Sequence, residues 1–93
     1  MTGMKLWVDD ERPAPEGWCG VETSAAAIDV LATHTVTEMS LDYMLRRGDR
    51  TDTVLYWLEN HPDRWPQHVH AHSSSSAACR LIEHMVVRLR PVP

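Results

Sequence analysis

The sequence is poor in cysteine, in basic residues and in long apolar runs, and each shortage excludes a class of protein. Its 93 residues include 2 cysteines, Cys19 and Cys79, too few for a disulfide scaffold and without the spacing of a CxxC metal site. No apolar run approaches the ~20 residues that span a bilayer. The N-terminus lacks the apolar core of a signal peptide, so we expect a cytoplasmic protein without membrane contact.

Basic residues are outnumbered by acids. The chain has 9 Lys+Arg and 13 Asp+Glu, for a net charge of −4, and twelve of the acids lie in residues 1–63. This distribution provides no basic stripe that would coat duplex DNA, although it permits recognition of one phosphate group. The apolar fraction of 43% excludes a disordered chain, and the length predicts one domain over residues 1–93.

Strand and helix patterns alternate along the chain. Short apolar or alternating runs predict strands at 4–8, 18–22, 36–41 and 68–72. Helical spacing predicts helices at 25–32, between Asp52 and Pro62, and at 78–89, with Ser24 and Asp52 expected as N-caps of the first two. This alternation predicts an α/β fold with a mostly parallel sheet and flanking helices.

Three of the expected strands end in polar, ionisable residues. Asp9 and Asp10 follow the first strand, Asp42 follows the third, and His72 and Ser73 follow the fourth. The carboxyl ends of parallel strands share one sheet edge, so these groups should converge there. Three close carboxylates repel one another unless a cation neutralises them, and Mg²⁺ prefers such ligands. The alternative is that one Asp caps a turn and the others are solvated.

A run of four serines follows His72 and leads into the last expected helix. Free backbone N–H groups at a helix start, with hydroxyls beside them, form an anion site. We therefore predict that Ser73, Ser75 and Ser76 bind phosphate, with Ser75 or Ser76 also serving as the N-cap.

The fourth expected strand carries His68, His70 and His72 on one face. Three ligands along a strand spread over ~13 Å, so one metal ion cannot take all three. A zinc site formed by His70 and His72 remains an alternative to a half-solvated face of an edge strand.

The residues at these strand ends resemble those of the response-regulator receiver. Asp9, Asp10, Asp42 and Ser73 match its paired acids, its central Asp and its later Ser/Thr. A phosphorylatable receiver also needs a lysine after its fifth strand. The only lysine here is Lys5, and this disfavours phosphorelay signalling.

A closer resemblance is to the cyclic-phosphate-processing receiver-like family of phages and bacteria. Residues 6–18 resemble its first motif, a strand running into Asp-Asp-x-Arg-Pro, while residues 40–42 and 72–73 match the starts of its second and third motifs. The resemblance implies a reduced flavodoxin-like, three-layer fold with a four-stranded sheet of order 2-1-3-4. It also implies that the protein, if it is phage-encoded, is located in the cytoplasm of the host.

The family resemblance implies a metal-dependent phosphoesterase that processes a cyclic phosphate on a nucleotide or RNA end. In this interpretation Mg²⁺ is the cofactor, His72 is the general acid and Arg12 neutralises developing charge. The metal ligands would be Asp9, Asp10 and Asp42, the last of them also a catalytic residue.

The chain departs from the family pattern after its central Asp, where Tyr43 and Met44 replace His-Asp, and Ser75 replaces an Asn of the third motif. These replacements favour an alternative function: a degenerate module that binds or sequesters a nucleotide or a protein partner. The sequence does not determine the oligomeric state.

Overall fold

Four parallel strands form the centre of the fold, in the order β2-β1-β3-β4. The computed structural model describes residues 3–92. Its elements, in chain order, are β1 (Met4–Val8), β2 (Cys19–Val21), α1 (Ser24–Thr33), β3 (Val36–Leu41), α2 (Asp52–Glu59), β4 (His68–Ala71) and α3 (Ser76–Leu89), with short 3₁₀ turns η1 (Arg46–Gly48) and η2 (Pro62–Arg64). The predicted strand order and receiver-like α/β fold are confirmed, and all strand pairs are parallel.

The hydrophobic core lies on one face of this sheet. Alternation along β1 buries Leu6 and Val8, and the register pairs them with Met39 and Leu41 of β3 on the same face. The helices cover this face with their own buried residues, which are Ala27, Leu31, Val54, Leu55, Leu58, Ile82 and Met85. Full burial of one such aliphatic side chain contributes about 1.5–3 kcal/mol, so this face supplies most of the stabilising burial.

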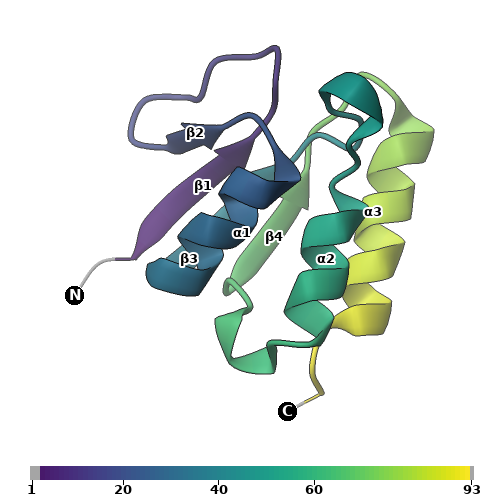
Figure 1. Ribbon diagram of the computed structural model, residues 1–93. Coiled ribbons are helices and arrows are strands. Elements are labelled where there is room, and N and C mark those ends of the chain that lie inside the picture. The colour runs from purple at the N-terminus through teal and green to yellow at the C-terminus, as the bar shows by residue number, and fades with distance from the viewer. Residues whose placement is uncertain (1–2, 93) are drawn as a thin grey trace.

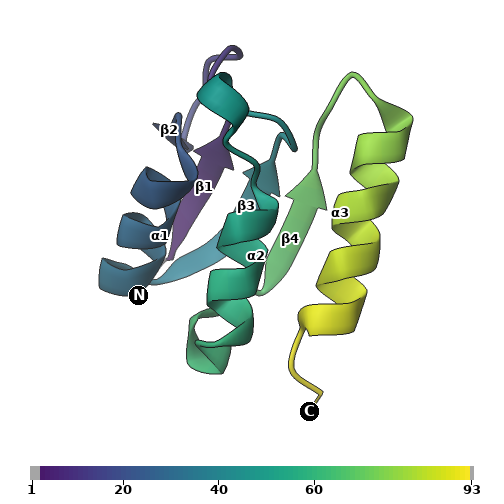
Figure 2. The same ribbon diagram turned by 45° about the vertical axis from the view of Figure 1, so that its right-hand side comes forward.

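The helices form a single layer, which corrects the predicted three-layer arrangement to two layers. In the figures α1, α2 and α3 lie side by side in front of the sheet, and α2 packs against both neighbours (Figures 1 and 2). The crossovers from β2 to β3 and from β3 to β4 run in the same direction across the sheet. Right-handed connections therefore place α1 and α2 on one face. The connection from β1 to β2 contains Pro13 and Pro15 and forms a loop without a helix, so no helix from this connection covers the sheet.

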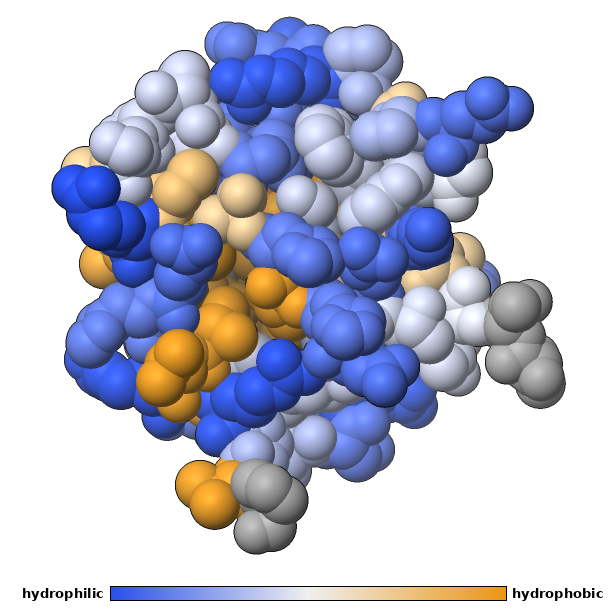
Figure 3. All heavy atoms as spheres, turned by 180° about the vertical axis from the view of Figure 1, so that it is seen from behind, coloured by the Kyte–Doolittle hydropathy of each residue, from blue (hydrophilic) through white to orange (hydrophobic). Residues whose placement is uncertain are grey.

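The other face of the sheet is uncovered by helices. It presents Lys5, Trp7, Glu38, His68 and His70, all partly or largely exposed. Viewed from behind, most of this side is hydrophilic, with a smaller hydrophobic patch toward the α3 side (Figure 3). The histidines of β4 thus occupy an exposed face of an edge strand, as one sequence interpretation expected.

Two of the expected helix caps are wrong by one residue. Thr23 caps α1, with its Oγ1 accepting from the Ala26 N–H at 3.0 Å. Ser24 instead lies in the helix, where its hydroxyl donates to the Arg50 carbonyl at 3.0 Å. Asp52 is likewise the first residue of α2, and Thr51 takes the cap position. In both cases two adjacent residues could form the cap. For α1, the contact of Ser24 with the loop before α2 leaves Thr23 as the cap.

Other element boundaries shift slightly. The strand expected at 18–22 shortens to Cys19–Val21, and that expected at 68–72 ends at Ala71, which leaves His72 beyond the strand. The helix expected at 78–89 begins at Ser76, and Ser75 is its N-cap as predicted. Among residues 3–92, no helix is long and apolar enough to cross a membrane.

Candidate functional site

The first part of the site is a tight turn at the end of β1. The buried Asp9 carboxylate accepts hydrogen bonds through Oδ1 from the backbone N–H groups of Glu11 at 2.8 Å and Arg12 at 3.1 Å. An Asp that bonds to the backbone two residues on is a common turn former. Trp7 Nε1 donates to the Arg12 carbonyl at 3.1 Å and closes the turn from the sheet side. The turn therefore fixes both Asp9 and Arg12.

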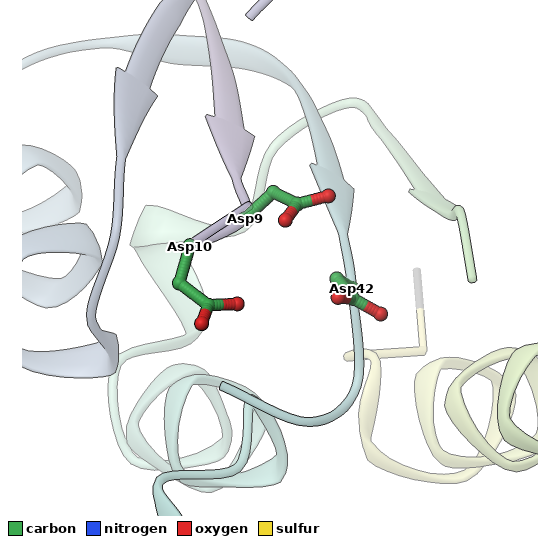
Figure 4. A group of neighbouring side chains, drawn as sticks. All are labelled: Asp9, Asp10 and Asp42. Carbon is green, nitrogen blue, oxygen red and sulfur yellow. The ribbon is translucent and has the colours of Figure 1, made fainter. Parts of the chain in front are cut away.

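Three carboxylates meet at this edge of the sheet. Asp9 and Asp10 follow β1, and Asp42 follows the adjacent β3 (Figure 4). Each offers an oxygen, and these three oxygens lie within 4.8 Å of one another. The structure thus brings together the acids that the sequence placed at the strand ends.

Two arginines already balance part of the acidic charge. Arg12 Nη1 lies 3.0 Å from Asp9 Oδ2 and 3.8 Å from Asp42 Oδ2, so it bridges acids from two strands. Arg46 Nε lies 3.2 Å from Asp10 Oδ2, and its Nη2 donates to the Asp10 carbonyl at 3.2 Å. The sequence did not predict a role for Arg46. Its side chain reaches Asp10 because η1 folds the loop back toward β1, and the sequence carries no signal for that fold.

His72 is held by a hydrogen-bond chain that the sequence analysis also missed. Its Nε2 lies 3.0 Å from Asp9 Oδ2, its Nδ1 lies 2.7 Å from Ser40 Oγ, and its ring stacks on Trp7 with centroids 3.7 Å apart. Since an ionised carboxylate only accepts, His72 Nε2 carries the proton and Nδ1 accepts from the buried Ser40 hydroxyl. Both ring nitrogens are therefore engaged within the chain.

Burial and neighbouring charges shift the pKa values of the three titratable groups at the centre of the site. Burial alone would raise the pKa of Asp9, but hydrogen bonds from Glu11, Arg12 and His72 lower it below its ordinary value of 3.8. Burial, and then the negative charge of Asp9, raise the pKa of Asp42. Burial lowers the pKa of His72 from its ordinary 6.5 against the opposing effect of Asp9. At neutral pH we therefore take Asp9 as ionised and His72 as neutral.

A cavity of about 700 Å³ opens beside the carboxylates, between the loop after β3 and the beginning of α3. Its polar lining includes Arg12, Asp42, Ser73 and Ser75, and also Ser74, which the sequence analysis left out. A smaller cavity of about 320 Å³ reaches Asp9. The larger cavity is therefore lined by part of the acidic group, Asp10 and Asp42, and by the serine loop.

The serines of this loop are used in different ways. Ser73 Oγ accepts from the Ser75 N–H at 3.2 Å, and Ser75 Oγ accepts from the Ala78 N–H at 3.2 Å as the cap of α3. Ser76, predicted to bind phosphate, lies in α3, and neither Ser76 nor His72 belongs to the lining of the larger cavity. Ser73 and Ser74 are thus the serines best placed for a ligand.

The donor set suits a divalent cation. Ligands of Mg²⁺ are hard oxygens at about 2.0–2.1 Å, so oxygens on opposite sides of the ion are about 4.2 Å apart. At most one pair of three ligand oxygens can be opposite, and adjacent ones are about 3 Å apart, so the oxygens of Asp9, Asp10 and Asp42, which lie within 4.8 Å of one another, would move closer together around the ion. Asp10 and Asp42 are the more available ligands, because both oxygens of Asp9 already accept hydrogen bonds.

A parallel sheet of receiver order, with acids gathered at the carboxyl ends of its central strands, defines a receiver-like α/β domain. The chain belongs to the cyclic-phosphate processing receiver domain family, whose sequence profile matches residues 4–88. No curated protein and no solved structure matches the chain significantly. The family match confirms the resemblance seen in the sequence, and its name indicates a role in cyclic-phosphate processing.

Proposed function

We propose that this domain is a metal-dependent phosphoesterase that opens a cyclic phosphate on a nucleotide or RNA end. The observation that supports it best is the group of three carboxylates beside a cavity that also contains Arg12 and the serine loop. Carboxylates alone would repel an anionic phosphodiester, so the proposal requires a divalent cation at Asp9, Asp10 and Asp42. The family name, which refers to cyclic-phosphate processing, supports a cyclic phosphate as the substrate.

The reaction adds water to phosphorus and breaks one P–O bond of the ring, and the released oxygen takes a proton. When bound, Mg²⁺ would supply Lewis-acid polarisation and lower the pKa of its water. Arg12 is placed to neutralise charge on the phosphoryl oxygens, because its guanidinium is partly exposed at the cavity. Ser73 and the backbone at the start of α3 would hold the phosphate.

His72 is the proposed acid for the released oxygen. Its Nε2–H donates to Asp9, so proton delivery requires this hydrogen bond to be exchanged for one to the substrate. The lowered pKa of His72 makes the neutral form dominant, and that form still carries the Nε2 proton. Cleavage should therefore weaken sharply in a His72→Phe variant, which keeps a stackable ring but has no proton to give.

The experiment is a turnover assay with adenosine 2′,3′-cyclic phosphate, run with Mg²⁺ and with excess chelator, and read as the ring-opened monoester. We expect product only with the metal, and none from Asp42→Ala at unchanged folding. Asp63→Ala is the matched control, since Asp63 lies exposed on η2, away from the cavity lining. Cleavage that persists in chelator would contradict the proposal. The same assay on an RNA that ends in a 2′,3′-cyclic phosphate shows whether the free nucleotide or the RNA end is the better substrate.

The second candidate is a binding module that sequesters a nucleotide or protein partner without turnover. It is favoured by His72, whose ring nitrogens are both engaged and which lies outside the lining of the larger cavity. Tyr43 and Met44, which replace the family's His-Asp, leave no imidazole in that part of the lining. Tight binding of the cyclic nucleotide without product would favour this candidate over the phosphoesterase.

A further inference from the structure

The larger cavity has a second wall that the proposed chemistry does not use. Met44 and Leu81 line it, and these large apolar side chains are 55% and 42% exposed. Ala77 and Ala78 at the start of α3 extend the same wall. Apolar side chains gathered beside a polar site commonly mark the place where the apolar part of a ligand binds.

Buried neighbours hold this wall in place. Met44 forms an isolated antiparallel bridge with Arg50, and the Leu45 N–H donates to the Asp49 carbonyl at 2.8 Å, so the loop is tied to itself. Leu45 is buried in the core next to Met44, and Ile82 is buried next to Leu81. The two exposed side chains therefore come from anchored backbone, one on the loop after β3 and the other on α3.

We propose that this wall, formed by Met44, Leu81, Ala77 and Ala78, binds the nucleobase of a nucleotide whose phosphate lies at Arg12 and Ser73. This inference rests on the proposed function and names its substrate as a nucleoside cyclic phosphate, in preference to a sugar or inorganic phosphate. A volume of about 700 Å³ lies within the range for sites that enclose small organic ligands. Thioether and aliphatic groups pack well on the face of an aromatic base.

Charge within the cavity indicates the orientation of this ligand. The cations Arg12 and Arg46 belong to the end of the lining that holds the carboxylates, whereas the wall has no charged group of its own. With the divalent cation that the proposed function requires at the carboxylates, an anionic phosphate is favoured at the first end, and an uncharged ring at the second. The ribose would bridge the two.

The test measures binding of adenosine 3′-phosphate and ribose 5-phosphate in Mg²⁺ by calorimetry; both are monoesters, so turnover does not interfere. We expect the wild type to bind the nucleotide at least about tenfold more tightly, equal to about 1.4 kcal/mol. The double variant Met44→Ser/Leu81→Ser should lose this preference. Val87→Ser on the same helix, 80% exposed and outside the lining, should keep it. Met44→Gln is a second, milder variant with the same expected direction.

Equal affinities in the wild type, no binding of either ligand, or a preference that survives in a folded double variant would overturn the inference. So would sedimentation showing a dimer that the Leu81→Ser change dissociates, because a second copy would then cover the wall. A retained nucleotide preference without ring opening overturns the phosphoesterase alone. Ring opening at equal kcat/KM for substrates with and without a base overturns the nucleobase site alone.

Discussion

Replacing His72 with alanine should destabilise the fold much more than the same change at His70, although both residues lie on the uncovered side of the sheet. The His72 side chain is 18% exposed and bonds to Ser40 and Asp9, whereas that of His70 is 52% exposed, bonds to the partly exposed Glu38 and has its ring centroid 6.3 Å from that of the exposed His68. A buried polar group left without a partner costs about 1–3 kcal/mol. The Ser40 hydroxyl would be such a group.

The expected magnitude follows from the contacts that are lost. Asp9 keeps three other hydrogen bonds, so the unpaired Ser40 hydroxyl dominates, and the lost stacking on Trp7 adds about 0.5–1.5 kcal/mol. Together these give about 1.5–4.5 kcal/mol for His72→Ala. An exposed polar contact such as that of His70 with Glu38 contributes about 0–1 kcal/mol. The difference is large against the 5–15 kcal/mol of a typical domain.

The assay is urea unfolding at pH 7, followed by tryptophan fluorescence, for both single variants and for a cycle of Ser40→Ala with His72→Ala. If the hydrogen-bond chain is formed as described, the cycle should give a coupling energy of about 1 kcal/mol. A His72→Ala loss no larger than that of His70→Ala, together with zero coupling to Ser40, would refute the reasoning. The cycle is needed because the size of the single loss alone does not separate stacking from hydrogen bonding.

Four further predictions concern the acids, Arg12 and the serine cap. The pKa of Asp42 is raised above 3.8 in the folded protein. The contribution of protonated Asp42 to the free energy of unfolding is therefore present below pH 3.8 and is lost as the pH rises through the folded-state pKa. Asp42→Asn should be more stable than the wild type at pH 7 but not at pH 3, as measured by urea unfolding. Mg²⁺ should raise the Tm of the wild type and not that of Asp42→Asn. Arg12→Gln should bind Mg²⁺ severalfold more tightly by calorimetry, because a competing cation is removed, yet bind phosphate ligands more weakly; a weaker affinity for both would contradict the bridging role of Arg12. Ser75→Ala should cost about 1 kcal/mol in urea unfolding as a lost helix cap, whereas Ser76→Ala should stay within about 0.5 kcal/mol.

The sequence predicted the acidic group because its signal is local. A buried apolar run followed at once by acids identifies both the strand and its functional end, and Asp9, Asp10 and Asp42 all follow that rule. Strand alternation with helices then predicted the parallel sheet. These features depend on neighbouring residues alone, so they were accessible without coordinates.

The partners of those acids depend on long-range register and loop shape, which the sequence does not specify. Ser40 is a polar residue in an otherwise apolar strand end, and its role becomes visible only when the sheet register places it beside His70, two residues before His72. To predict the contact of Arg46 with Asp10, one would need to know the shape of the turn η1, in which Arg47 has a φ of 60°. To predict a single layer of helices, one would need to know that both crossovers run in the same direction across the sheet.

The single layer of helices also explains why His72 and Trp7 matter to the acids. In a two-layer fold the uncovered sheet face offers nothing to shield a carboxylate at its edge, yet Asp9 is only 3% exposed. The ring of His72, stacked on Trp7, shields Asp9 from solvent on that side, and the side chains of His72 and Arg12 both bond to Asp9 Oδ2. Without this cover Asp9 would gain water and lose the hydrogen bond from His72, which is one of those that lower its pKa. A change at Trp7 should therefore alter metal binding as well as folding, even though Trp7 contributes no ligand.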